Sequence, residues 1–102
     1  MGFIKKTHIV ISKEIQDIVP AYVASLKTDL DRLKTLTTHG DLTEVVEFAH
    51  RLKGVAESYG FPMLTQWGKD LEVCAQSGKV RSSEEILEKI SSFIDGVEIK
   101  YE

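Results

Sequence analysis

Apolar residues recur every three or four positions in four separate segments of this 102-residue chain, and this spacing constrains its fold more than any other feature. Such spacing places the apolar side chains along one face of an α-helix. In the clearest segment the apolar residues are Val45, Ala49, Leu52, Ala56 and Tyr59. Similar stripes run through residues 23–36, 64–75 and 86–97. The sequence therefore predicts an all-α fold.

Glycines and capping residues mark where these helices end and begin. Gly40, Gly60 and Gly78 each follow a helical stripe, where glycine commonly ends a helix. The residues 41–44 and 82–85 have the spacing of capping boxes, which open helices. The resulting connections are only a few residues long, and short connections favour antiparallel neighbours. We therefore expect an antiparallel up-down four-helix bundle.

The N-terminal part of the chain is less regular. Residues 3–11 alternate weakly and include β-branched side chains, but the segment is too short and isolated to be expected in a sheet. We expect an extended or frayed arm over 1–11 and the helical bundle over 12–100. A short extra helix is predicted over 13–19, after a good capping residue at Ser12. Pro20 then either begins the next helix or kinks a continuous one.

Length and composition predict one small domain spanning residues 1–102. A net charge of −3 gives no reason to expect a nucleic-acid partner. No apolar run approaches the ~20 residues needed to cross a bilayer, and residues 1–12 lack the features of a secretion signal. The single cysteine, Cys74, fits a reducing compartment. We therefore expect a free-standing cytoplasmic monomer without a membrane partner.

His50 is the candidate functional residue. It lies about 100° around the helix from Ala49, at the edge of the apolar stripe or outside it. Lys53 and Gly54 are its i+3 and i+4 neighbours and share its patch of surface. The pattern predicts an accessible imidazole beside a cation, with no side chain at the next position along the helix. A largely neutral imidazole of this kind suits a nucleophile that takes up a phosphoryl group from a bulky protein partner.

The run from His50 through Lys53 and Gly54 to Gly60 resembles the histidine-containing phosphotransfer (HPt) domain family, in its stand-alone bacterial type. The core motif of that family is His-x-x-Lys-Gly, followed by a glycine six residues on. Residues flanking the motif also look like the family: Phe48, Ala49, Leu64, Gly68, Leu71 and Glu72. The resemblance covers about residues 10–100, and it implies the four-helix bundle that the periodicity predicts independently.

The resemblance implies a phosphocarrier of a two-component multistep phosphorelay. His50 would accept a phosphoryl group on Nε2 from the aspartate of a receiver domain and pass it to another receiver. We expect Lys53 to help hold the phosphoryl group and Gly54 to give the partner steric access. Gly60 and Gly68 are expected to be structural. The residues expected to contact the partner are Val46, Glu47, Arg51, Val55 and Glu57.

The expected partners are response-regulator receiver domains and a hybrid or histidine kinase, with no cofactor on this chain and Mg²⁺ on the receiver. An enzyme is not expected, because the chain has no glycine-rich phosphate loop or nucleotide motif. Nor is a metal site, because His8, His39 and His50 lack ligand spacing. The alternative is an HPt-like helical adaptor that binds receiver or kinase domains without being phosphorylated.

Overall fold

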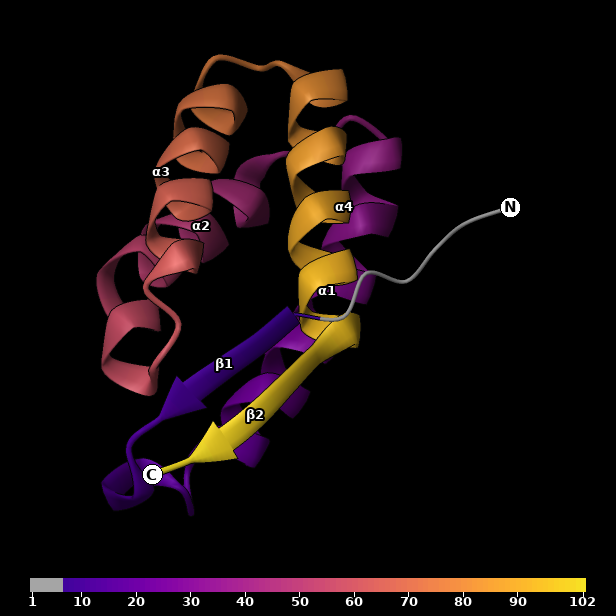
Figure 1. The fold of residues 1–102 in the computed structure, drawn as a ribbon. Coiled ribbons are helices and arrows are strands. Elements are labelled where there is room, and N and C mark those ends of the chain that lie inside the picture. The colour runs from indigo at the N-terminus through magenta and orange to yellow at the C-terminus, as the bar shows by residue number, and fades with distance from the viewer. Residues whose placement is uncertain (1–6) are drawn as a thin grey trace.

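The computed structural model describes residues 7–102. Within this range four α-helices form the body of the molecule (Figure 1). They are α1 (Val19–Thr38), α2 (Thr43–Val55), α3 (Met63–Gln76) and α4 (Val80–Gly96). Two short 3₁₀ turns are also present, η1 (Lys13–Ile15) and η2 (Ala56–Tyr59). The predicted all-α four-helix bundle with a short extra N-terminal helix is confirmed.

The predicted apolar stripes meet in one core. Helix α3 packs against both α2 and α4, and α1 packs against α4. Each helix contributes side chains that are almost fully buried, among them Leu30, Leu33, Val45, Leu52, Leu64, Leu71, Leu87 and Ile90. None of the four helices, which all lie within residues 7–102, combines the length and apolar character that crossing a membrane requires.

The helix boundaries follow the predicted signals in part. Gly40, Gly60 and Gly78 each take a positive φ after a helical segment, as expected. Asp41 Oδ1 accepts a hydrogen bond from Thr43 N–H at 3.1 Å just before α2. The predicted capping box at 41–44 is nevertheless wrong, because Leu42 is the N-cap residue and the Glu44 carboxylate pairs with Arg32.

The predicted capping box at 82–85 is wrong, because α4 begins earlier, at Val80. The Lys79 carbonyl already accepts a hydrogen bond from Ser83 N–H at 3.0 Å, which places Ser83 inside the helix. The predicted helix over 13–19 is also shorter than expected, since only the 3₁₀ turn Lys13–Ile15 forms. Pro20 lies in the first turn of α1, so it begins that helix and does not kink it.

The two ends of the chain form a sheet that the sequence did not predict. Strand β1 (Thr7–Ile11) pairs in parallel with β2 (Val97–Tyr101), in the register Thr7↔Val97 to Ile11↔Tyr101. The expectation of an arm too isolated for a sheet is therefore wrong for residues 7–11, and residues 1–6 of that arm lie outside the described residues. The helical bundle likewise ends at Gly96 and does not reach 100. Each strand finds its partner at the opposite end of the chain, where a local pattern cannot reveal it.

Gly60 connects this sheet to the bundle. It ends η2 in the left-handed region with φ +90°, and Ile11 at the end of β1 packs directly against it. A Cβ at position 60 would lie 2.8–2.9 Å from three side-chain carbons of Ile11, which is itself buried. The position therefore needs glycine both for its backbone conformation and for this contact.

Gly68 sets the spacing of α2 and α3. A Cβ at position 68 would lie 2.8 Å from Lys53 N, 3.1 Å from Lys53 Cα and 3.2 Å from the Ala49 carbonyl oxygen. All three are backbone atoms, so a side chain could be admitted only by moving one helix away from the other. The two helices therefore touch through their backbones at the turn that carries Ala49 and Lys53.

We predict that Gly60→Ala destabilises the protein more than Gly40→Ala does. Both positions have positive φ, which costs a residue with a Cβ about 1–2 kcal/mol. Only position 60 adds the overlap with Ile11, a further cost of about 1–3 kcal/mol. Chemical denaturation of the two variants measures the difference. Equal losses would contradict the contact between Gly60 and the end of β1.

We predict opposite effects for alanine at the two glycines inside helices. Gly68→Ala should lower the free energy of unfolding by about 1–3 kcal/mol, because the new methyl group overlaps the α2 backbone. Gly54→Ala should raise it by about 0.5–1 kcal/mol, because no atom lies within 4 Å of the added Cβ and alanine favours the helix. Urea titrations of both variants check the pair. A Gly68→Ala protein as stable as Gly54→Ala would exclude the close approach of the helices.

Candidate functional site

His50 lies on α2 with its imidazole in solvent. Its side chain is 70% exposed, whereas its neighbour Ala49 and the nearby Leu52 are buried in the core. The sequence placed His50 at the edge of the apolar stripe or beyond it, and the structure places it beyond the stripe. The imidazole is therefore open to a macromolecular partner.

One carboxylate from α3 contacts both His50 and Lys53. Glu72 Oε2 lies 3.0 Å from His50 Nδ1, and Glu72 Oε1 lies 2.6 Å from Lys53 Nζ. The Glu72 side chain is only 13% exposed. A side chain on the neighbouring helix thus bridges His50 and Lys53.

These contacts determine which ring nitrogen is available. The hydrogen bond from Lys53, and then that from His50, holds the pKa of Glu72 below its usual range, although burial acts in the opposite direction. An ionised carboxylate can only accept hydrogen bonds, so Nδ1 of His50 must carry the proton that is donated to Glu72. In the neutral ring the lone pair is then on Nε2. Within residues 7–102 no hydrogen-bond partner contacts this Nε2.

Glu72 is the site residue that sequence reasoning missed. Its position contributed to the family resemblance, but no role was predicted for it. The signal was present in its distance from Gly68, a glycine that was expected to be structural and that lies four positions earlier on the same helix. Residues at i and i+4 share a helix face. Gly68 is where α3 contacts α2, at Lys53. Glu72 lies one turn further along α3 on the same face, so its side chain lies beside Lys53.

No side chain projects from the surface beside His50 at position 54. Gly54 is exposed, and a Cβ built there would have no atom within 4 Å. Lys53 lies beside His50 as predicted, and it is half-buried and already paired with Glu72. No group of three or more His, Cys, Asp or Glu side chains in the described range is placed to hold a metal ion.

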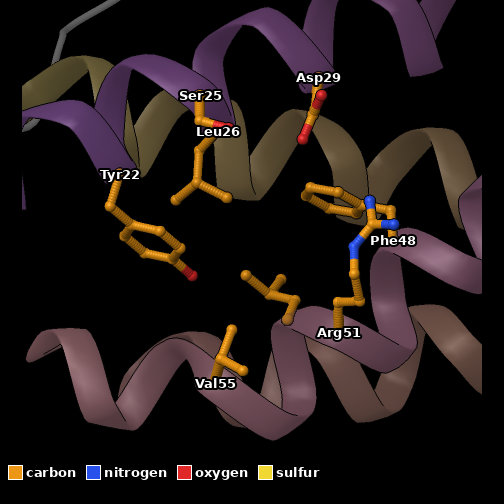
Figure 2. A pocket seen from close by; sticks show the side chains of 8 residues that line it. Tyr22, Ser25, Leu26, Asp29, Phe48, Arg51 and Val55 are labelled. Carbon is orange, nitrogen blue, oxygen red and sulfur yellow. The ribbon is translucent and has the colours of Figure 1, made fainter.

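A groove between α1 and α2 includes Arg51, the residue after His50, in its lining (Figure 2). Its volume is about 170 Å³, and its lining residues are Tyr22, Ser25, Leu26, Asp29, Phe48, Arg51, Leu52 and Val55. Figure 2 shows Arg51 and Asp29 on opposite sides of the groove and the Tyr22 hydroxyl directed into it. That hydroxyl has no hydrogen-bond partner among residues 7–102, and burial, with a smaller effect of Tyr59, raises the pKa of Tyr22 to about 12.

The five residues predicted to contact a partner are not all brought to this groove. Arg51 and Val55 line it, and Val55 is exposed. Val46 is partly buried and packs against the core, so only part of its side chain is accessible. Glu47 and Glu57 are exposed and lie outside the groove lining. The structure thus separates two groove residues from two surface carboxylates.

Comparison with known proteins agrees with this geometry. The family model described as Hpt domain matches residues 17–99 of the chain. No curated protein and no solved structure gives a match. Hpt domains act as phosphocarriers rather than catalysts, and they interact with receiver domains and histidine kinases. With the match covering most of its length, the chain belongs to the Hpt domain family, which supports a histidine phosphotransfer role in phosphorelays.

Proposed function

We propose that this protein accepts a phosphoryl group on His50 Nε2 from a receiver-domain aspartate and passes it to the aspartate of another receiver. The observation that carries the proposal is the exposed imidazole whose Nδ1 is occupied by Glu72, which leaves Nε2 facing solvent. Among the described residues, the site has a nucleophile and a cation but no group that would generate a phosphoryl donor. It therefore suits a carrier that depends on its partners for the activated phosphate.

The transfer needs no proton to move within this chain. The Nε2 lone pair attacks phosphorus, the bond between phosphorus and the aspartyl oxygen breaks, and the receiver's carboxylate leaves with that electron pair. The ring becomes a cation that still carries its proton on Nδ1. Attack by a second receiver's carboxylate reverses these changes. The receiver's acidic pocket and Mg²⁺ supply much of the electrostatic stabilisation, and we propose no cofactor on this chain.

Lys53 is placed to bind the transferred group. An ammonium has three N–H donors, and the contact with Glu72 uses one of them. Two donors remain for the oxygens of a phosphoryl group on the neighbouring imidazole. Because Lys53 follows His50 by three positions on α2, both side chains project from the same face of the helix.

We propose that the receiver docks over Gly54 and the α1–α2 groove. The groove has an apolar floor, which includes Leu26 and Leu52, and a charged rim at Asp29 and Arg51. Apolar patches with polar rims are typical of transient protein interfaces. Glu47 and Glu57 would meet the edge of the partner, and Val46 would contribute the accessible part of its side chain.

Labelling with phosphoramidate tests the acceptor directly. The wild-type protein should gain the mass of one phosphoryl group, and brief acid treatment should remove it, whereas His50→Gln should gain none. His39→Gln is the matched control: His39 is also exposed on a helix end, with Nδ1 2.8 Å from the Thr35 carbonyl oxygen, and its variant should label as the wild type does.

The same experiment distinguishes the phosphocarrier function from the alternative, an adaptor that binds receiver or kinase domains without being phosphorylated. An adduct that persists in His50→Gln would show that His50 is not the acceptor. A wild-type protein that binds a receiver but is never labelled, by phosphoramidate or by the phosphorylated receiver, would support the adaptor.

We predict that a large side chain at position 54 slows phosphoryl transfer from a receiver domain but not uptake from a small donor such as phosphoramidate. Gly54→Leu should slow transfer from a phosphorylated receiver by about tenfold or more, because the leucine holds the two reacting groups apart. Uptake from phosphoramidate should stay within about twofold, since that donor is small and needs no docking. Lys89→Leu, which adds leucine to the exposed side of α4, is the control and should change neither rate. Unaltered transfer from the receiver to Gly54→Leu would exclude docking over Gly54.

A further inference from the structure

We infer that the α1–α2 groove is a binding site for a small aromatic zwitterion, of the chemical class of an aromatic α-amino acid. The inference goes beyond the proposed function, since it assigns a ligand to this chain and not a step of phosphoryl transfer. The ligand would occupy the floor that the proposed receiver covers, so the two would compete. Three features carry the inference: the volume of the groove, a hydroxyl at one end and two opposite charges at the other.

The space in the groove matches one aromatic ring. Its volume is about 170 Å³, and an apolar cavity of about 150 Å³ is large enough to bind benzene. Leu26, Phe48 and Leu52 are buried and provide an apolar lining, to which Val55 adds an exposed apolar side chain. A ring placed among these side chains would remove apolar surface from water, which favours binding.

Tyr22 supplies a hydrogen-bond donor at one end of the groove. Its ring stacks on that of Tyr59, with the centroids 4.0 Å apart and an angle of 5° between the planes. This stacking fixes the ring, so its hydroxyl stays directed into the groove (Figure 2). The hydroxyl oxygen is buried and has no hydrogen-bond partner within residues 7–102, which costs free energy. A ligand oxygen that accepts from this hydroxyl would remove that cost.

Arg51 and Asp29 supply opposite charges away from Tyr22, on the two sides of the groove (Figure 2). Arg51 forms no ion pair with another residue in the range 7–102. Asp29 has only a long contact of 3.8 Å with Arg32, whose shorter ion pair, at 3.1 Å, is with Glu44. A guanidinium binds a carboxylate, and a carboxylate binds an ammonium. The pair therefore matches the two charged groups of an α-amino acid.

The two polar ends of the groove have a separation that suits such a ligand. Tyr22 and Asp29 are seven residues apart on α1, which corresponds to about 10 Å along the helix axis. One ring with an oxygen at one end and a zwitterion at the other spans this separation when a hydrogen bond is added at each end. A ligand that is polar at one end alone would leave either the Tyr22 hydroxyl or the two charges without a partner.

Titration of the intact protein with L-tyrosine, followed by ¹H–¹⁵N NMR, tests the site. The amide signals of groove residues such as Leu26 and Leu52 should shift progressively, with a Kd on the order of 1 mM, which is ordinary for a ligand of about a dozen non-hydrogen atoms. L-Phenylalanine lacks the oxygen for Tyr22, and tyramine lacks the carboxylate for Arg51. Each should bind about fivefold more weakly, because one hydrogen bond or charged contact is lost.

Two variants assign these contacts, and a third is the control. Tyr22→Phe should remove the preference for L-tyrosine over L-phenylalanine, because the donor is gone. Arg51→Gln should remove the preference for L-tyrosine over tyramine. Arg81→Gln removes an exposed arginine from α4, outside the groove lining, and should leave all three affinities unchanged. If Tyr22→Phe or Arg51→Gln fails to fold, the comparison of the three ligands on the wild type decides alone.

The titration needs no receiver and no phosphoryl donor, so its outcome is separate from that of the proposed function. Groove signals that do not shift with L-tyrosine, or that give the same Kd for all three ligands, would overturn the inference and leave the phosphocarrier function standing. Groove signals that respond to a receiver but to none of these ligands would show that a receiver side chain occupies the groove, which overturns the inference as well. A protein that binds L-tyrosine as expected but takes up no phosphoryl group would refute only the carrier function.

Discussion

The backbone contact between α2 and α3 at Gly68 is the constraint on which the site depends. Because position 68 has no side chain, α3 approaches the turn of α2 that holds Ala49 and Lys53. The next turn of α3 then presents Glu72 directly to Lys53 and His50. Without this approach the carboxylate would lie too far from the ring to hold it. A packing feature inside the bundle thus sets the chemistry of a side chain on its surface.

The site combines one exposed side chain, His50, with two less exposed ones, Lys53 and Glu72. In the proposed function a protein partner must reach Nε2 of the exposed His50, and an exposed side chain is ordinarily free to rotate. Glu72 and Lys53, which are less exposed, limit that freedom from the side facing the protein. The arrangement resembles the general pattern in which a carboxylate orients the histidine that reacts. It keeps the imidazole accessible and still defines its orientation.

The parallel pair of β1 and β2 closes the molecule at the end opposite to the loop between α3 and α4 (Figure 1). The pair joins the beginning of the described chain to its last residues, and Ile11 passes from the sheet into the core against Gly60. Gly60 in turn ends the segment that starts with the helix of His50. The sheet therefore restrains the far end of the site's own segment, which neither the apolar periodicity nor the capping signals indicated.

The sequence by itself determined the helices and the exposed position of His50, because both depend on local spacing. Helical periodicity placed Ala49 and Leu52 inside and His50 outside, and glycines marked three helix ends. The end of α4 could not be predicted, because Val97 fits a helical stripe as well as a strand, and its pairing partner Thr7 lies at the other end of the chain. Only the tertiary structure decided that Lys53 is paired rather than free and that Nδ1 of His50 is occupied. Both facts require Glu72 from another helix, and the distance between two helices depends on how their surfaces pack.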